Sequence, residues 1–420
     1  MLTILGLTLL IILSNSIRAE IITDGTLGHQ IDLPGPHFQI TADLGQQHGG
    51  NLFHSFQEFN LQSHESATFS GPNEVQNVIS RVTGGNPSTI DGLIRSTIPN
   101  AEVYFLNPYG ILFGPNAQLD VQGGFHASTA DYLRLQDGGR FETRYPNESI
   151  LTVASVETFG FLTDSPASIQ THTSRLLVPD EKTLSFIGGD LHFTSEIPLV
   201  ADNTQPIPPV TAASILAASY GRVNLASLAG RGEVILSEND LILEGQGGKI
   251  TIEDTLVELS GRGGGSAFIR AGQFFLNNTI IRSNTFGDQD GKNISLKVTE
   301  AAYLNGGASE LSIATVTPKN AGSIFIDAPF LDMTSAFINT GAVFVGAAGS
   351  IEINAHQAFL KEGAMIGSGV MGSGRIGNVI LNVTDRLSIS GYYPGLRLTH
   401  AQAMDNTRSM LITYSHPNRN

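Results

Sequence analysis

The sequence has 420 residues but contains no cysteine and no tryptophan, and only 15% of its residues are charged. Without cysteine the protein has no disulfides, so the stability of the fold depends on its hydrophobic core. The unfolded chain also cannot be cross-linked in an oxidising compartment and can still be threaded through a pore. The charged share lies well below the roughly 25% of an average soluble domain. Glycine is abundant, with 47 residues. The length fits two or three domains or one repetitive array, and this composition favours an array of short strands joined by turns.

Positive charge is also scarce, with 23 lysine and arginine residues against 38 aspartate and glutamate residues and a net charge of −15. Binding to a polyanion requires clustered basic side chains. The basic residues are isolated along this chain, so the composition excludes nucleic acid and anionic lipid surfaces as partners.

Long apolar runs are missing except at the start, where residues 4–13 are apolar apart from Thr8 and small polar residues lead to Ala19. This pattern predicts a signal peptide over residues 1–19, with cleavage between Ala19 and Glu20. The run is shorter than the roughly 20 residues of a membrane span. No later stretch is long enough, so the sequence predicts export without a stable membrane span.

A glycine-led phrase recurs in the second half of the chain. The intervals between its leading glycines are 17, 26, 31, 27 and 28 residues. Repeats of this size indicate a solenoid, because a propeller blade needs roughly 40 residues or more. The copies are GKITIED, GSAFIRA, GKNISLKV, GSIFIDAP, GSIEINA and GNVILNV, starting at Gly248, Gly265, Gly291, Gly322, Gly349 and Gly377.

Apolar residues inside each phrase are two positions apart, as in Ile324 and Ile326, which is the pattern of a strand with one buried face. We therefore predict an all-β, right-handed parallel β-helix of the single-stranded, pectin-lyase-like type with an N-terminal capping region. Each coil would lie on the previous one. Phe53, Phe56 and Phe59 are expected to pack in the capping element.

Two segments depart from this pattern. Residues 196–211 contain four prolines, which cannot donate to a strand ladder, and they are expected to form a loop that leaves one continuous helix. The coils would thus extend over residues 161–390. Residues 391–420 lose the glycine-led phrase, and the sequence leaves open a cap, a disordered tail or the edge of a truncated reading frame.

The stretch FLNPYGILFGPNAQLDV, residues 105–121, combines two turns with strand alternation. Asparagine, proline and glycine occupy the first, second and fourth positions of NPYG, as a type I turn prefers. A coil whose turns are determined by local residues can form without contacts to residues far away in the sequence. The candidate site residues are those of the turn and the strand that follows it: Asn107, Pro108, Tyr109, Gly110 and Ile111.

NPYGI resembles the NPNGI motif of the two-partner-secretion domain at the amino end of filamentous-haemagglutinin-like exoproteins. DGTLG (24–28), NLFHSFQEFNL (51–61) and VISRVTGGNPSTIDGLI (78–94) resemble the same domain in the same order. The resemblance places a secretion domain at residues 20–160. Tyr109 stands where the family motif has asparagine, and the companion NPNL motif has no match.

The resemblance implies a specific route of export. Such proteins enter the periplasm through a signal peptide, stay largely unfolded, and are recognised by the periplasmic modules of an outer-membrane transporter barrel. They then fold outside, secreted or at the surface of a Gram-negative-type cell. The expected role is that of an adhesin-like or haemagglutinin-like exoprotein that meets a host-cell, neighbouring-cell or matrix ligand.

Two alternatives remain: a remnant of a longer exoprotein without its own effector region, and a polysaccharide-degrading β-helix enzyme. Such enzymes need carboxylates at a fixed separation or calcium-binding aspartate clusters, and the sequence offers neither pattern. We expect no catalytic residue, no cofactor and no metal. Five histidines near the amino end are expected to be structural or solvated: His29, His37, His48, His54 and His64.

Overall fold

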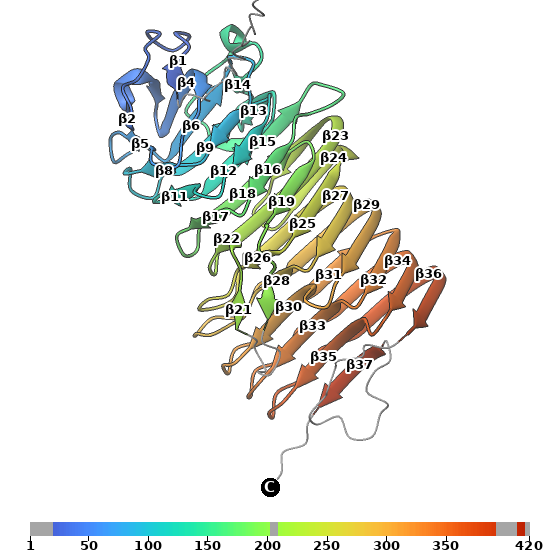
Figure 1. Cartoon of the computed structure of the whole chain (residues 1–420). Helices are drawn as coiled ribbons and strands as arrows, with labels where there is room; N and C mark the ends of the chain where they lie inside the picture. The colour runs from blue at the N-terminus through green and yellow to red at the C-terminus, as the bar shows by residue number, and fades with distance from the viewer. Residues whose placement is uncertain (1–19, 202–208, 392–409, 416–420) are drawn as a thin grey trace, which may run out of the picture.

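The computed structural model describes residues 20–201, 209–391 and 410–415 (Figure 1). The expected signal peptide and most of the segment 391–420 lie outside these residues. The chain winds into an elongated stack of coils, with the amino-terminal coils at one end and the carboxy-terminal coils at the other. Each complete coil contributes one strand to each of three columns, so the fold is the predicted parallel β-helix.

The first column begins near the amino terminus and runs the length of the stack. Its strands pair in parallel in this order: β4 (Asn51–Phe59), β6 (Asn77–Val82), β9 (Glu102–Leu106), β12 (Phe125–Ser128), β18 (Thr183–Gly188), β23 (Arg222–Leu236), β27 (Ser266–Asn277), β29 (Ile294–Asn305), β31 (Ile324–Asp327), β34 (Ile351–Lys361) and β36 (Val379–Ser390).

The second column follows the first around each coil, and the long strands β27, β29, β34 and β36 bend to serve both columns. Its other strands also pair in parallel: β7 (Ser88–Ile90), β10 (Ile111–Phe113), β16 (Ile169–His172), β19 (Leu191–Thr194), β25 (Lys249–Glu253) and β32 (Phe330–Thr334).

The third column consists of two parallel stacks. The first contains β2 (His37–Thr41), β5 (Ser66–Ser70), β8 (Leu93–Ser96) and β11 (Gln118–Asp120). The second contains β17 (Arg175–Val178), β22 (Ser214–Ala218), β26 (Thr255–Glu258), β28 (Ile280–Arg282), β30 (Glu310–Thr315), β33 (Phe337–Ala342), β35 (Met365–Val370) and β37 (Met410–Ser415).

Antiparallel strands cap the amino-terminal end of the stack. β1 (Ile21–Thr23) and β3 (Gln46–His48) pair with β4, and a short 3₁₀ turn, η1 (Ala42–Leu44), precedes β3. The Pro-rich segment, which connects β19 of the second column to β22 of the third, also holds an antiparallel pair, β20 (Val200–Ala201) with β21 (Val210–Thr211). Ala201 and Val210 pack against Leu256 and Ile280 of the third column.

The sequence did not predict a second antiparallel sheet that lies on the outer face of the first column. Its apolar side chains form a second core with outward-facing residues of the early coils, including Phe53 and Tyr104. It consists of the carboxy-terminal part of β23 together with β13 (Tyr132–Leu135), β14 (Arg140–Glu142), β15 (Val156–Phe161) and β24 (Leu241–Gly247), and the 3₁₀ turn η2 (Pro146–Glu148) follows β14.

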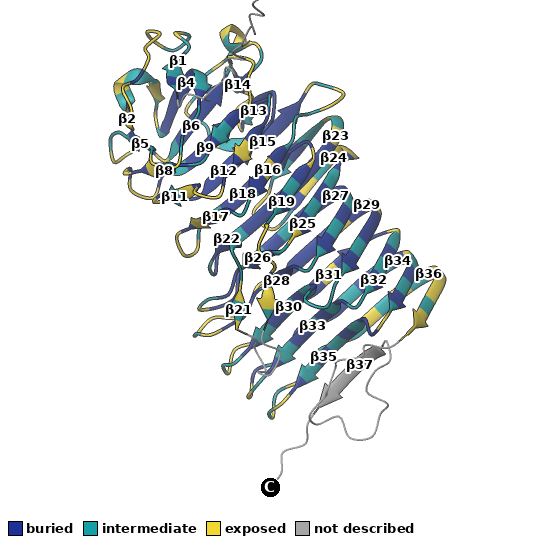
Figure 2. Ribbon diagram, viewed as in Figure 1, coloured by how far each residue is buried: buried dark blue, intermediate teal, exposed yellow. Residues whose placement is uncertain are grey.

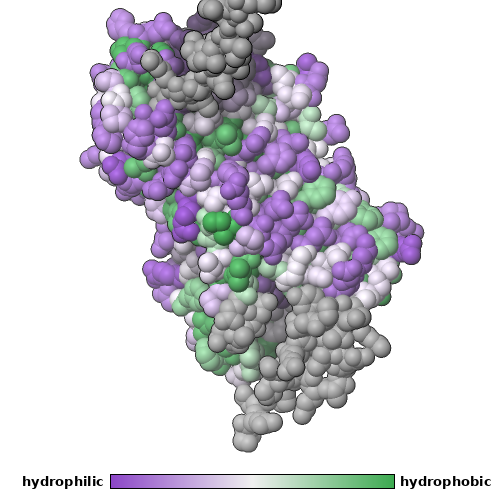
Figure 3. Space-filling model, in the orientation of Figure 1, coloured by the Kyte–Doolittle hydropathy of each residue, from purple (hydrophilic) through white to green (hydrophobic). Residues whose placement is uncertain are grey.

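The helix interior is an apolar ladder produced by the alternation within each strand. Ile294, Ile324, Ile351 and Val379 occupy the same position on four successive coils. Figure 2 shows this burial running along the middle of the strands, with exposure at the turns and at β36. On the face shown in Figure 3, hydrophilic side chains predominate and hydrophobic ones form small patches. Burial of the interior supplies the stabilisation that cysteine-free chains cannot draw from disulfides.

The glycine-led phrases belong to two columns. The phrases that begin at Gly265, Gly291, Gly322, Gly349 and Gly377 stack in the first column. The phrase at Gly248 leads β25 in the second column, where Ile250 pairs with Phe274 of β27. The 17-residue interval is therefore not a coil length.

The stacked glycines are needed for close approach of the backbone. A Cβ atom added to Gly349 would overlap the carbonyl oxygen of Gly322, and one added to Gly377 would overlap that of Gly349. A side chain at these corners would therefore force adjacent coils apart.

Candidate functional site

Three of the motif segments meet around the side chain of Arg81, which is completely buried in β6. Ser55 of β4 lies directly opposite Arg81 on the preceding coil. The Arg81 Nε atom donates a hydrogen bond to Ser55 Oγ at 2.7 Å, and Nη2 donates to Thr26 Oγ1 at 2.8 Å. Asp24, Ser55 and Arg81 thus bring DGTLG, NLFHSFQEFNL and VISRVTGG to one place.

Asp24 completes this group as a carboxylate acceptor. Its Oδ2 atom accepts hydrogen bonds from Ser55 Oγ at 2.6 Å and Thr83 Oγ1 at 2.8 Å, and Oδ1 accepts from the backbone and side chain of Thr26. Burial opposes ionisation of Asp24, but these hydrogen bonds hold its pKa below the ordinary value. Burial lowers the pKa of Arg81 to about 10, partly offset by the Asp24 charge. Both groups are therefore charged at neutral pH.

The second antiparallel sheet closes over Arg81 from the outside. Arg81 Nη1 donates to the carbonyl oxygen of Glu142 and to Ser149 Oγ, and the guanidinium lies 4.3 Å from the ring centre of Phe141. Residues 141–149 are absent from the motifs that the sequence singled out. The Arg81 site is thus shared between the first coils and the second sheet.

The NPYG turn follows Leu106, which pairs with Arg81 of the preceding coil. The side chain of Asn107 holds this turn together. Asn107 Oδ1 accepts a hydrogen bond from the Tyr109 backbone at 2.9 Å, and the backbone of Gly110 donates to the Asn107 carbonyl at 3.2 Å. Asn107 Nδ2 reaches the preceding coil, where it donates to the Asn86 carbonyl and Ser88 Oγ, both at 3.0 Å. Gly110 has a φ of +123°, which favours glycine.

Burial divides the five turn residues. Asn107, Pro108, Gly110 and Ile111 are buried, and only Tyr109 is partly exposed. Arg144 packs over the Tyr109 ring at 5.0 Å and donates to the Pro108 carbonyl at 3.3 Å. The same guanidinium forms an ion pair with Asp131, a buried residue at the start of the second sheet. In the folded protein Tyr109 is therefore the member of the motif that reaches the surface.

His54 is the buried histidine of the amino-terminal group. Its ring lies between Phe56 and Phe69, and burial lowers its pKa to about 4. His29, His37 and His64 are exposed. Within residues 20–201, 209–391 and 410–415, no group of three histidine, aspartate or glutamate side chains is placed to hold a metal ion. Phe56 and Phe59 fill the helix interior, whereas Phe53 packs under the second sheet.

One cluster has the connectivity of a nucleophile, a base and an orienting carboxylate. His126 Nδ1 lies 2.9 Å from Ser185 Oγ, and Nε2 lies 2.6 Å from Glu102 Oε2. Burial opposes ionisation of Glu102, but the hydrogen bond with His126 keeps its pKa below the ordinary value. Ser185 is fully buried, so its hydroxyl group is closed to a substrate, and the cluster is a structural bridge between coils.

In the part of the chain that the structure describes, no helix has the length and apolar character of a membrane span.

The protein is 33% identical over 81 residues to a heme/hemopexin-binding protein of Haemophilus influenzae, a segment that covers 19% of this chain and 8% of that protein. A second heme/hemopexin-binding protein of H. influenzae is 29% identical over 99 residues, or 23% of this chain and 10% of its own length. The matches thus span about a tenth or less of these relatives.

Two solved structures are also similar. The HMW1 secretion domain from H. influenzae is 15% identical, with a TM-score of 0.45, over 88% of this chain and 97% of that one. A filamentous hemagglutinin secretion domain is 13% identical, with a TM-score of 0.34, over 87% and 99% of the respective chains.

The family model described as the TPS secretion domain matches residues 19–258. This span includes the Arg81 site, the NPYG turn and the whole second antiparallel sheet, and it extends beyond residue 160. TPS secretion domains are export domains and not an enzyme family. The chain belongs to the TPS secretion domain family of two-partner-secretion exoproteins.

Proposed function

We propose that this protein is a secreted, adhesin-like exoprotein whose amino-terminal coils are recognised by a dedicated outer-membrane transporter barrel. The observation that carries the proposal is the family match over residues 19–258. Residues 1–19 would act as the signal peptide and be removed between Ala19 and Glu20. The final location would be the cell surface or the medium, and the ligand would be met by the outer faces of the coils.

The burial of the NPYG turn bears on when recognition takes place. The side chains of Asn107 and Pro108 are inaccessible in the folded coil, so a transporter contacts them only before the coil has formed. Tyr109 is partly exposed in the folded coil and is accessible in both states. We therefore place recognition through Asn107 and Pro108 in the unfolded, periplasmic chain.

The fold suits export without an external energy source. Along the three columns each coil pairs only with its neighbours, so coils that emerge can add in turn to those already folded. Folding outside the barrel would then oppose backward movement of the chain. The absence of cysteine means that no disulfide can lock the chain before it is threaded.

The test is a binding measurement with purified periplasmic modules of a candidate barrel from the same genome. The full chain is presented either folded or freshly diluted from urea. We expect binding to the freshly diluted chain, reduced by Asn107→Ala and unaffected by Asn116→Ala in the neighbouring turn. Equal binding of both states, with no effect of Asn107→Ala, would contradict recognition before folding.

A further inference from the structure

A groove with a volume of about 850 Å³ lies on the outer face of the first column, just beyond the second antiparallel sheet. Its floor is formed by outward-facing residues at one register position on successive coils, namely Phe268, Ser295, Phe325 and Glu352. One wall is the hairpin between β23 and β24, with Glu238, Asn239 and Asp240. The volume is typical of sites for small or extended ligands.

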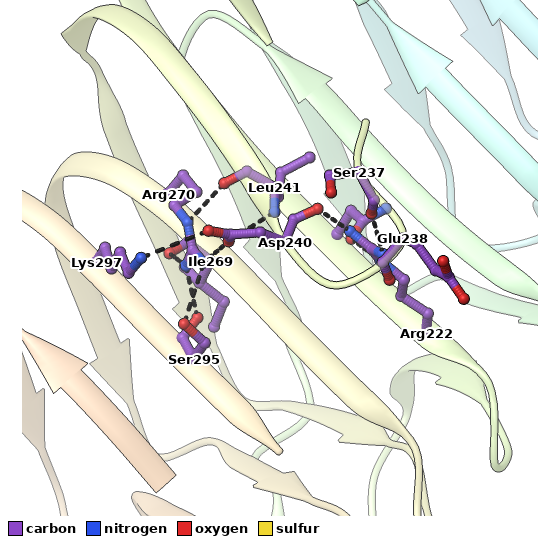
Figure 4. A network of polar contacts seen from close by, with 10 residues as sticks. Arg222, Ser237, Glu238, Asp240, Leu241, Ile269, Arg270, Ser295 and Lys297 are labelled. Atoms are coloured by element: carbon purple, nitrogen blue, oxygen red, sulfur yellow. Dashed lines mark hydrogen bonds and ion pairs between the residues drawn. The ribbon is translucent and has the colours of Figure 1, made fainter. Parts of the chain in front are cut away.

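Two arginines fix this wall in place (Figure 4). Arg222 donates to the backbone carbonyls of Ser237 at 2.7 Å, Glu238 at 2.9 Å and Asp240 at 2.6 Å. Arg270, almost fully buried, donates to the Leu241 carbonyl at 2.7 Å and pairs with the Asp240 carboxylate. These donors are therefore used to position the hairpin, and the groove is formed before a ligand arrives.

The side chains that remain available combine donors, acceptors and one aromatic face. Phe325 is 38% exposed on the floor. Glu238 and Asp327 are exposed, and neither carboxylate accepts a hydrogen bond from another described residue. The Lys297 ammonium group forms an ion pair with Asp240, at 3.5 Å. Hydroxyl groups both donate and accept, so they can bond to carboxylate and ammonium groups alike.

Charge and strand pairing restrict the class of ligand. Five carboxylates and three cationic side chains line the groove, which disfavours nucleic acid and other polyanions. A peptide added as an extra strand needs a free sheet edge, but the floor strands already pair on both sides with neighbouring coils. The groove instead offers side chains across several coils.

We propose that this groove binds a neutral oligosaccharide, with Phe325 stacking on a sugar ring and Glu238, Asp327 and Lys297 bonding to its hydroxyl groups. The site lies mostly beyond residue 258, outside the matched secretion domain. Binding at this groove therefore does not depend on the proposed export route.

The test uses the purified, folded full chain and calorimetric titration with defined probes: maltohexaose, cellohexaose, mannohexaose and chitohexaose, with a heparin hexasaccharide and hexalysine for comparison. At least one neutral hexasaccharide should bind saturably with one site per chain. Phe325→Ala and Asp327→Asn should each weaken that binding at least tenfold.

The matched control is Phe359→Ala. Phe359 is partly exposed in the second column and does not line the groove; its ring packs against that of Phe330, with ring centres 5.4 Å apart. It should leave affinity unchanged, and thermal unfolding confirms that each variant is folded. The proposal is overturned if no neutral hexasaccharide binds, if Phe325→Ala and Asp327→Asn leave binding intact, or if only hexalysine or heparin binds.

Discussion

The hydroxyl group of Ser55 bridges the guanidinium of Arg81 and the carboxylate of Asp24. Ser55 Oγ accepts a hydrogen bond from Arg81 Nε at 2.7 Å and donates one to Asp24 Oδ2 at 2.6 Å. The three residues belong to three separate motif segments. This polar bridge therefore ties the amino-terminal cap to the first two coils of the secretion domain, and the second sheet covers it.

Replacing Arg81 with methionine should destabilise the protein by about 3 to 5 kcal/mol, because the partially buried Asp24 loses its compensating charge. The matched control is Arg95→Met, since Arg95 and Asp120 form an exposed ion pair at 2.6 Å with side chains 44% and 46% exposed. Exposed pairs contribute about 1 kcal/mol or less. Urea unfolding of the full chain measures both, and equal losses would refute the bridge.

His54 should make stability depend on pH. Its pKa is about 4 in the folded protein and ordinarily about 6.5 in an unfolded chain. Because the folded state disfavours protonation, the contribution is complete above pH 6.5 and is lost as pH falls towards 4, by about 3 kcal/mol in total. Unfolding free energies at pH 7, 6, 5 and 4 measure this loss.

The variants His54→Leu and His64→Leu separate this effect from general acid sensitivity. His64 is exposed in the turn between β4 and β5. His54→Leu should flatten the decline between pH 6.5 and 4, whereas His64→Leu should retain it. A decline that survives in His54→Leu would assign the pH dependence to other groups.

Gly349→Ala should destabilise the helix by roughly 1 to 3 kcal/mol or more, because the added Cβ overlaps the carbonyl oxygen of Gly322 on the adjacent coil. Gly341→Ala is the control, since its nearest neighbour would lie 3.8 Å away and its φ is not positive. Chemical unfolding monitored by circular dichroism reports both. Similar stability of the two variants would disprove close backbone approach at the first-column corner.

Two substitutions in the NPYG turn should differ in their effect on stability. Asn107→Ala removes the hydrogen bonds to Asn86, Ser88 and Tyr109, and should cost about 1 to 3 kcal/mol and lower export. Tyr109→Phe should preserve stability, because no hydrogen bond engages the Tyr109 hydroxyl within the described chain. Normal secretion of Asn107→Ala, quantified in the medium, would remove this turn from the export route.

The sequence was sufficient to predict the parallel coils, because residues such as Ile324 and Ile326 alternate and recur at coil-length intervals. Stacking them needs only contacts between neighbouring coils. The phrase at Gly248 was harder to place, since first-column and second-column strands carry the same alternation. The pairing of Ile250 with Leu191 of β19 and Phe274 of β27 assigns it to the second column.

The sequence pattern did not predict the second antiparallel sheet. Thr158 pairs with Ile235, and nothing local distinguishes these strands from the coils. The burial of Arg81 was not predicted either, because an arginine inside an alternating strand indicates an exposed side chain. Its burial depends on Thr26 and Ser149, which lie far away in the sequence. Phe53 pairs with Gln46 of the cap, but its ring also packs under the second sheet, because β4 is buried on both faces.

Secretion of the full chain tests the export route most directly. The protein is expressed with its own amino terminus in a Gram-negative host, with and without a candidate transporter barrel, and folded protein in the medium and on the cell surface is quantified. Recognition by the barrel predicts secretion only when the barrel is present, with the chain retained in the periplasm otherwise. Equal secretion in both strains would contradict it.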